Sequence, residues 1–217
     1  MIYRILSALA SYPDEALLAA LPEICQSLDA WPDARETLSP LTELLTGGDL
    51  IALQENYVAT FDRNPAHSLH LFEHIHGESR DRGQAMVDLL EEYRRHGVEP
   101  SGSELPDHVP TFLELLGMMP PSEAEALLDD AIHVLAGIGA RLARNESPYA
   151  AVFVVLTTLT DVVPRELGEP PVRDMDEAMD AFGVGDDGVE PLLKPDNQHT
   201  IRFYPRREGA QRTGAMQ

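Results

Sequence analysis

Apolar residues recur three and four positions apart along most of the chain, which is the spacing of one face of an α-helix. Ile2, Ile5 and Leu9 give the first such stripe. No stretch shows the alternation of apolar and polar residues, bounded by tight turns, that is typical of β-hairpins. The pattern therefore predicts an all-α fold, with one domain of about eight helices over residues 1–162 and a mostly irregular, mobile tail over residues 163–217.

Capping residues and prolines predict where several helices begin and end. Asp14 and Asp49 are expected to cap two helices, and Ser122 and Glu125 have the spacing of a capping box. The prolines expected to break, kink or split a helix are Pro22 and Pro40.

Two further prolines predict helix starts later in the chain. Pro106 is expected near the beginning of one helix, where a missing backbone amide costs little. Ser147 and Pro148 are expected to start a last helix of about fourteen residues, too long for a usual strand. Because that helix has apolar residues on nearly every side, we expect it to lie in the centre of the fold.

Acidic residues dominate the charge of the chain. Its 217 residues include 37 acids and 16 lysines and arginines, a formal net charge of −21. Such a field repels nucleic acid and anionic lipid, so we expect neither as a partner. The single cysteine, Cys25, cannot form an internal disulfide and is compatible with a reducing cytoplasm. We see no signal peptide and no apolar run long enough to span a membrane.

The charge changes sign in the tail. Residues 200–217 contain four arginines and one glutamate, a net charge of +3, so the rest of the chain carries −24. A basic tail can lie back on an acidic body or remain in solvent. Because exposed ion pairs are weak, the charges alone favour solvent.

Polar chemistry is concentrated in the His-rich stretch, residues 68–83, which reads Ser-Leu-His-Leu-Phe-Glu-His-Ile-His-Gly-Glu-Ser-Arg-Asp-Arg-Gly. His70 and His74 would share a helix face, and Glu73 or Glu78 would be the third ligand of a metal. However, the zinc-hydrolase pattern His-Glu-x-x-His is absent, and one cysteine cannot build a cysteine zinc site. Hydrogen bonds at a helix junction explain these histidines more simply, so we predict no metal and no cofactor.

Three motifs together resemble a known family. They are Tyr57-x-x-x-Phe61-Asp62-Arg63, the His-rich stretch, and Glu104-Leu-Pro-Asp-His108 with Phe112-Leu-Glu114. They resemble the respiratory nitrate reductase assembly chaperones, the delta-subunit family, within the broader TorD-like redox-enzyme maturation chaperones. The resemblance runs from Ser7-Ala-Leu-Ala-Ser-Tyr-Pro13 to about Met179, which is most of the chain.

The resemblance implies an all-helical, TorD-like fold without enzymatic activity. It implies a cytoplasmic protein that binds the catalytic alpha subunit of nitrate reductase and keeps it competent for molybdenum cofactor insertion before the membrane complex assembles. It also implies recognition of the N-terminal segment of that client, a peptide with apolar and basic residues. An acidic body with an apolar groove would suit such a peptide.

A metal-dependent all-α hydrolase is the alternative from a different functional class. It would use the His/Glu/Asp cluster at residues 70–81, with nitrogen and oxygen ligands on several helices. Enzymes of that type need paired His-Asp steps. This chain has Asp107-His108 but no His-Asp step, so we favour the chaperone.

The motifs also predict where a client would bind. We expect a groove between the helix ending at Phe61, the His-rich stretch and the helix beginning near Asp107. The residues expected to bind the client are Tyr57, Phe61, Leu71, Phe72, Glu73, His74, Glu78, Glu104, Asp107, His108 and Glu114. The apolar residues among them would form the walls or belong to the core, and the acids would pair with basic client residues or cap a helix.

Overall fold

The computed structural model describes residues 1–77, 81–100 and 104–165, and this part of the chain is helical without β-strands. The α-helices are α1 (Ile2–Ala10), α2 (Glu15–Ser27), α3 (Pro32–Gly47), α4 (Leu50–Tyr57), α5 (Leu71–His76), α6 (Asp81–Arg95), α7 (Val109–Met118), α8 (Pro121–Arg144) and α9 (Ala150–Thr157). Short 3₁₀ turns at Leu28–Ala30 and Pro65–His67 and a π turn at Val58–Asp62 connect them. The all-α prediction is confirmed, while Glu78 and residues 166–217 lie outside the described part.

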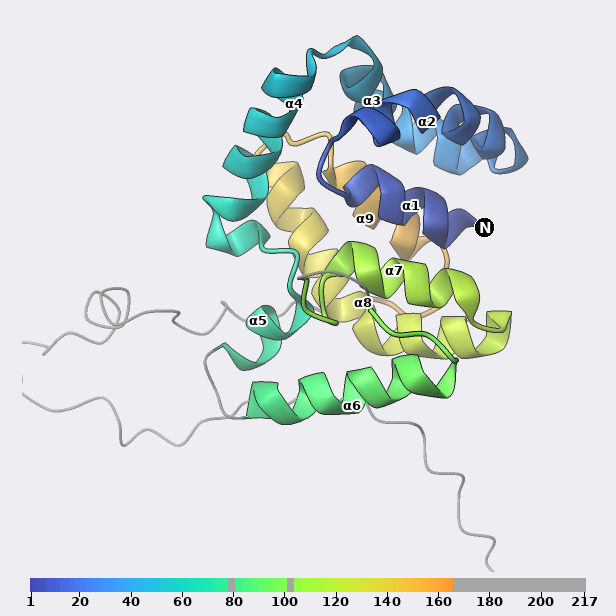
Figure 1. The fold of residues 1–217 in the computed structure, drawn as a ribbon, viewed down its shortest axis with the longest axis vertical. Helices are drawn as coiled ribbons and strands as arrows, with labels where there is room; N and C mark the ends of the chain where they lie inside the picture. Colours follow the sequence, from blue (N-terminus) through green and yellow to red (C-terminus); the bar gives the residue numbers. More distant parts are fainter. Residues whose placement is uncertain (78–80, 101–103, 166–217) are drawn as a thin grey trace, which may run out of the picture.

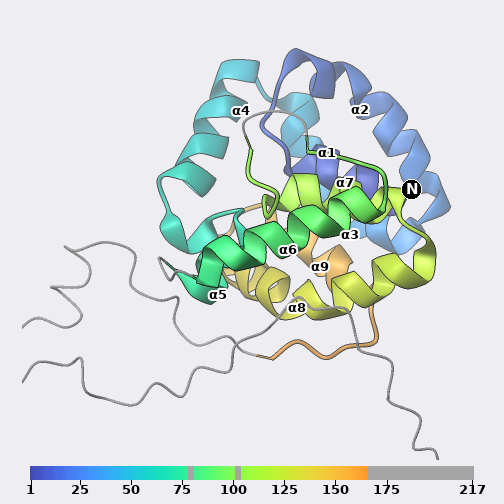
Figure 2. The same cartoon turned by 60° about the horizontal axis from the view of Figure 1, so that its bottom comes forward.

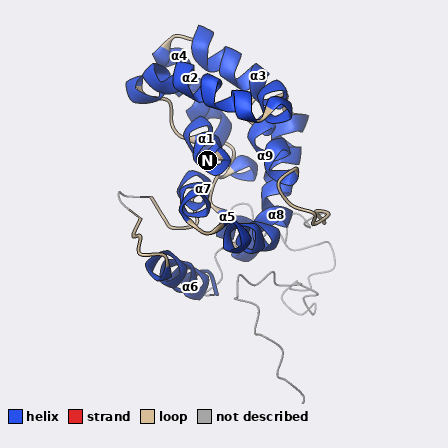
Figure 3. Cartoon of the chain, turned by 90° about the vertical axis from the view of Figure 1, so that its right-hand side faces the viewer, coloured by secondary structure: helices blue, strands red, loops and turns tan. Residues whose placement is uncertain are grey.

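Helices α1, α7, α8 and α9 form the centre of the fold, with α2, α3 and α4 on one side and α5 and α6 on the other (Figure 1). The most extensive helix pairs are α1 with α7 and α8 with α9. Turned by 90°, the molecule shows α6 at its edge, packed outside α7 and α5 (Figure 3). One continuous core of buried apolar side chains joins these layers.

The capping aspartates act as predicted. The Asp14 carboxylate accepts a hydrogen bond from the Leu17 amide at 2.7 Å, and Asp49 accepts one from Ala52 at 3.4 Å. The prolines at positions 22 and 40 do not end their helices, because α2 and α3 continue through both. Buried leucines beside each proline, among them Leu21 and Leu41, hold the helices on the core. Tertiary packing therefore outweighs the lost backbone hydrogen bond.

The predicted capping box is wrong, and α7 and α9 begin two or three residues after their predicted starts. Helix α8 begins at Pro121 after Pro120, and no side chain caps its first turn, so Ser122 lies inside the helix and forms no capping box. Helix α7 begins at Val109 rather than near Pro106, because Pro106 and Asp107 form a turn and His108 is extended. Helix α9 begins at Ala150, after the predicted start.

Helix α9 is also shorter than predicted, with eight residues. Its end coincides with two threonines. The hydroxyl groups of Thr157 and Thr158 donate to the carbonyl oxygens three residues earlier, both at 2.7 Å. Such side-chain bonds compete with helix propagation. The predicted central position is right, since Val152, Phe153, Val155 and Leu156 are buried, although Val154 is half-exposed.

Two glycines give a matched test of this packing. A Cβ atom on Gly139 of α8 would lie 2.5 Å from Cβ of Phe153 on α9, whereas one on Gly83 of α6 would meet nothing within 4 Å. Gly83→Ala should raise the free energy of unfolding by about 0.5–1 kcal/mol through helix propensity. Gly139→Ala should lower it, because overpacking costs about 1–3 kcal/mol and outweighs that gain. Urea unfolding measures both, and equal effects of the two substitutions would contradict the close α8–α9 contact.

Candidate functional site

The His-rich stretch and the Glu104–His108 motif meet through a short backbone pairing at His70 and His108. The Leu71 amide donates to the Asp107 carbonyl oxygen at 3.1 Å, and the Val109 amide donates to the Leu69 carbonyl oxygen at 2.8 Å. His70 and His108 thus form an isolated antiparallel bridge just before α5 and α7 begin. This pairing brings two of the three sequence motifs together.

A buried carboxylate holds this junction. The Asp107 side chain is fully buried, and its Oδ2 accepts a hydrogen bond from the Phe72 amide at 3.0 Å. Its Oδ1 lies 3.2 Å from Nδ1 of His70. Asp107 therefore caps the first turn of α5. The sequence had suggested instead that Asp107 caps the helix that follows it, α7.

The two histidines of the bridge have opposite electrostatic environments, although their ring centroids are only 5.3 Å apart. The hydrogen bond to Asp107 raises the pKa of His70, and the charges of Glu73 and Glu104 add to this rise against the effect of burial. Burial lowers the pKa of His108, although Glu104 acts against it. The junction thus favours a protonated His70 beside a neutral His108.

A second network ties the His-rich stretch to α8. Arg141 donates from Nε to the Ala66 carbonyl oxygen at 2.7 Å, and its Nη2 lies 3.0 Å from Nδ1 of the buried His74. Nε2 of His74 lies 2.8 Å from the carbonyl oxygen of Ser68. Because arginine only donates and a carbonyl only accepts, His74 is held as the neutral tautomer with its proton on Nε2.

A similar arrangement surrounds the buried His67. Its Nδ1 donates to the Thr60 carbonyl oxygen at 2.9 Å, and its Nε2 accepts from Nδ2 of Asn145 at 2.8 Å. Helix α8 therefore anchors both the segment before the His-rich stretch and the stretch itself. These histidines are used as structural hydrogen-bonding groups, in agreement with the simpler explanation from the sequence.

The four apolar residues expected to line a groove are buried. Tyr57 and Phe61 are each 5% exposed, while Leu71 and Phe72 are fully buried. Tyr57 packs its ring 4.7 Å from that of Phe61, and both rings contact Tyr149. The Tyr57 hydroxyl donates to the Ala10 carbonyl oxygen at 3.0 Å, and burial strongly raises its pKa. These side chains belong to the core, the alternative that the sequence left open.

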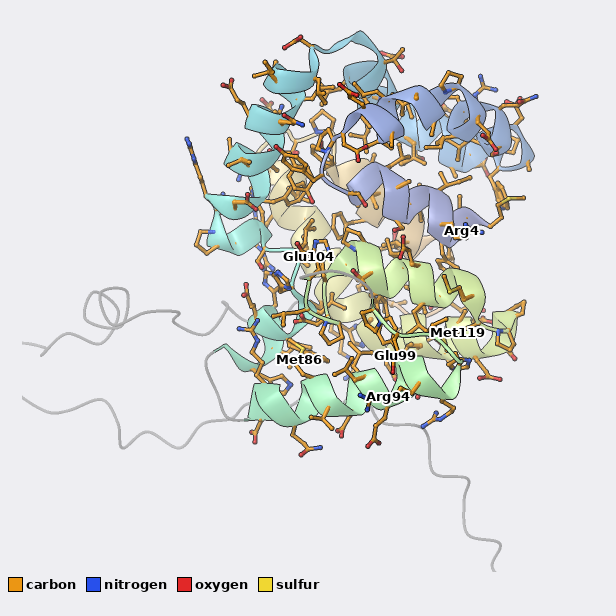
Figure 4. The ribbon with its side chains drawn as sticks, viewed as in Figure 1. Arg4, Met86, Arg94, Glu99, Glu104 and Met119 are labelled. Atoms are coloured by element: carbon orange, nitrogen blue, oxygen red, sulfur yellow. The ribbon has the colours of Figure 1, made fainter. Side chains whose placement is uncertain are left out.

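The predicted acids lie on different faces. Glu73 is half-buried and accepts hydrogen bonds from the Ser68 hydroxyl and from Arg82. Glu104 is exposed between the π turn and α7 (Figure 4). Its charge acts to raise the pKa of Tyr57, His70 and His108.

Glu114 is also exposed but lies toward α6, since its charge acts on the buried Tyr93 hydroxyl. The structure thus brings Glu104 and Glu73 around the histidine pair, while Glu114 acts on Tyr93, whose hydroxyl donates to the Pro106 carbonyl oxygen at 3.0 Å.

The accessible charged groups around the histidine pair are mainly acidic. In the described residues, no three His, Cys, Asp or Glu side chains are grouped to hold a metal ion. Exposed Asp62 and Glu104 and half-buried Glu73 instead surround the half-exposed His70–His108 pair. Carboxylates on a rigid frame can pair with lysine or arginine side chains of a partner.

The sequence did not predict several residues that hold the site. Arg141 and Asn145 lie at the end of α8, spaced four apart, and Ser68 joins its hydroxyl to Glu73 and to the His70 amide. A polar pair at a helix end is ordinary in sequence. Only the fold, which brings α8 against residues 66–74, reveals their role.

The chain is similar to proteins of nitrate reductase assembly. The model of the nitrate reductase delta subunit family matches residues 27–155. A nitrate reductase molybdenum cofactor assembly chaperone, NarJ of Escherichia coli K12, is 41% identical over 187 residues, which are 82% of this chain and 79% of that protein.

Two further relatives have probable assembly-chaperone roles in their names. NarW of Escherichia coli K12 is 37% identical over 93% of this chain and 92% of its own length. NarJ of Bacillus subtilis 168 is 31% identical over 79% of this chain and 95% of its own length.

The buried carboxylate gives a pH-dependent prediction. Asp107→Asn should lower the free energy of unfolding by about 1.5–3 kcal/mol near pH 6, because a charged hydrogen bond is lost. His70 has a raised pKa in the folded state, so its contribution is fully present below the unfolded value of about 6.5 and is lost as the pH rises through the folded value. The difference from the unsubstituted protein should therefore shrink at high pH.

Urea unfolding from about pH 5.5 to about pH 8.5 measures this difference. Glu36→Gln is the control, since this exposed acid lies on α3, which takes no part in the junction, and it should leave the pH dependence unchanged. A loss for Asp107→Asn that is the same at every pH would contradict the His70–Asp107 pairing.

Proposed function

The chain belongs to the nitrate reductase delta subunit family, and we propose that it is a molybdenum cofactor assembly chaperone for a nitrate reductase. The observation that carries the proposal is the 41% identity, over 187 residues, to a protein named for this role. The relatives with assembly roles are named as chaperones and not as catalysts, which supports a function without an enzymatic reaction.

We propose that the client is the catalytic alpha subunit before it receives its cofactor. The chaperone binds the N-terminal segment of that subunit in the cytoplasm and keeps it competent for molybdenum cofactor insertion, then leaves before the membrane complex forms. None of the helices in the described residues is long and apolar enough to cross a bilayer. The charge of −21 also disfavours nucleic acid and anionic membranes as partners.

The surface around the histidine pair supports recognition of basic client residues. Glu73, Glu104 and His108 are accessible there, and Asp62 extends the acidic surface. Buried residues beneath this surface support it; they are Tyr57, Phe61, Leu71, Phe72, His74 and Asp107. We propose the accessible acids as the contacts and the buried residues as their support.

Affinity capture from cells that make a respiratory nitrate reductase tests the proposal. The full chain used as bait should recover the catalytic subunit without molybdenum. Elution should increase with ionic strength, because salt screens pairs of exposed charges. Recovery of the molybdenum-loaded subunit to the same extent, or of no nitrate reductase subunit, would contradict the proposed function.

A matched pair of variants tests the proposed contact surface independently of the proposed chaperone role. Asp62→Asn with Glu104→Gln removes two exposed acids near the histidine pair, while Glu36→Gln with Glu43→Gln removes two exposed acids on α3. The first variant should capture several-fold less client and the second should capture as much as the unsubstituted chain. Equal capture by both would place the contact elsewhere while leaving the chaperone role intact.

A further inference from the structure

A groove with a volume of about 680 Å³ lies between α6 and α8. Its lining residues are Asp88, Leu89, Glu91, Glu92, Arg95, Met119, Glu123, Ala126, Leu127, Asp129, Asp130, His133 and Val162. Met119, at the end of α7, lies where the C-terminal half of α6 approaches the start of α8 (Figure 4). None of these residues belongs to the histidine junction described above.

The groove combines an apolar floor with acidic walls. Leu89 and Met119 are buried at its base, with the partly buried Leu127 and Val162 beside them. Six carboxylates and only one arginine line the walls, which gives a strong local negative charge. This chemistry fits a segment with arginines next to aromatic or aliphatic side chains, since the floor buries the apolar groups and the walls attract the charges.

The last described residues of the chain, up to residue 165, lie at the rim of this groove. Val162 is one of its lining residues, and the Arg165 amide donates to Nδ1 of His133, another lining residue, at 3.1 Å. In Figure 2 the last described segment, coloured orange, runs beside α8. The tail therefore starts next to the acidic walls.

The tail contains one segment with the matching chemistry. Residues 201–207 read Ile-Arg-Phe-Tyr-Pro-Arg-Arg, which places three arginines around an aliphatic and two aromatic residues without any acid. We propose that residues 201–207 bind in the groove between α6 and α8 of the same molecule.

The connection between groove and segment is long enough. Residues 166–200 separate the rim from the segment, and an extended chain spans about 3.3–3.6 Å per residue, so the reach exceeds the distance across one groove many times. Because the segment is tethered, its effective concentration at the groove is high, which allows weak contacts to keep it bound. Exposed ion pairs alone favoured a tail in solvent, but the apolar floor adds burial of aromatic surface to them.

Binding of the tail would make the groove a regulated surface. Any other basic, apolar segment could enter it only by displacing residues 201–207. The proposal does not depend on the chaperone function, because it rests on the groove, the exit of the chain and the composition of the tail.

Paramagnetic relaxation in the full chain tests the proposal. In a Cys25→Ser background, Gln211→Cys carries a nitroxide label four positions beyond the segment, and amide signals are recorded from the ¹⁵N-labelled protein. We expect the signals of α6 and α8 residues around the groove to lose most of their intensity, while those of α3 keep theirs. Unchanged groove signals would overturn the proposal.

Two kinds of charge reversal show whether the contact has the proposed chemistry. Arg206→Glu with Arg207→Glu alters only the tail, and Glu91→Lys with Asp130→Lys alters only the groove; each should restore the groove signals. Glu36→Lys with Glu43→Lys on α3 changes the total charge by the same amount and sign as the groove reversal and should leave the signal loss in place. Signal loss that survives the tail reversal, which cannot affect the fold of α6 and α8 directly, would overturn the proposal.

A mixed sample separates binding within one molecule from binding between copies. Spin-labelled chain without ¹⁵N is mixed with ¹⁵N-labelled chain that carries no spin label. The groove signals of the second chain should keep their intensity. Signal loss in this mixture equal to that in the single sample would overturn intramolecular binding and assign the segment to the groove of a second copy.

Discussion

The buried carboxylate of Asp107 is the constraint on which the functional surface depends. A buried charge is costly unless it is paired and hydrogen-bonded, and Asp107 meets this condition through the Phe72 amide and His70. Satisfying it requires that the start of α5 lie against the extended segment before α7. That requirement fixes the histidine pair at the surface and turns Phe72 into the core. The position of these two segments against each other therefore depends on electrostatics as well as on apolar packing.

Structural hydrogen bonds occupy several histidines in and just before the His-rich stretch. His67 and His74 use both ring nitrogens to join α8 to the chain before α5. His70 pairs with Asp107, so its nitrogen is occupied as well. What remains accessible is an acidic rim on a rigid frame. A protein that recognises a partner needs such a preorganised surface, because contacts made without reordering lose less free energy on binding.

The two acidic surfaces of this protein differ in construction. Around the histidine pair, carboxylates stand above a fully packed core, and the surface offers charge with little apolar area. Between α6 and α8, the carboxylates border an open apolar floor. Helix α6 lies at the edge of the fold and packs less extensively than the central helices, which leaves this floor uncovered. Under the two proposals, a client segment and the tail of the chain would use different surfaces.

The sequence by itself determined the helical class, most helix positions, the aspartate caps of α2 and α4, the acidic charge and the family. These properties depend on local spacing and composition, which a linear pattern contains. Helix starts at Val109, Pro121 and Ala150 were missed, because long-range pairing or neighbouring prolines override local capping signals.

Only the tertiary structure decided which candidate site residues are buried and what they bind. Asp107 lies 35 positions from Phe72, and Arg141 lies 67 positions from His74. No spacing rule predicts such pairs, because each depends on how whole helices pack. The apolar residues of the predicted groove were consistent with either wall or core for the same reason, and packing of Tyr57 and Phe61 against Tyr149 and of α5 against α8 placed them in the core.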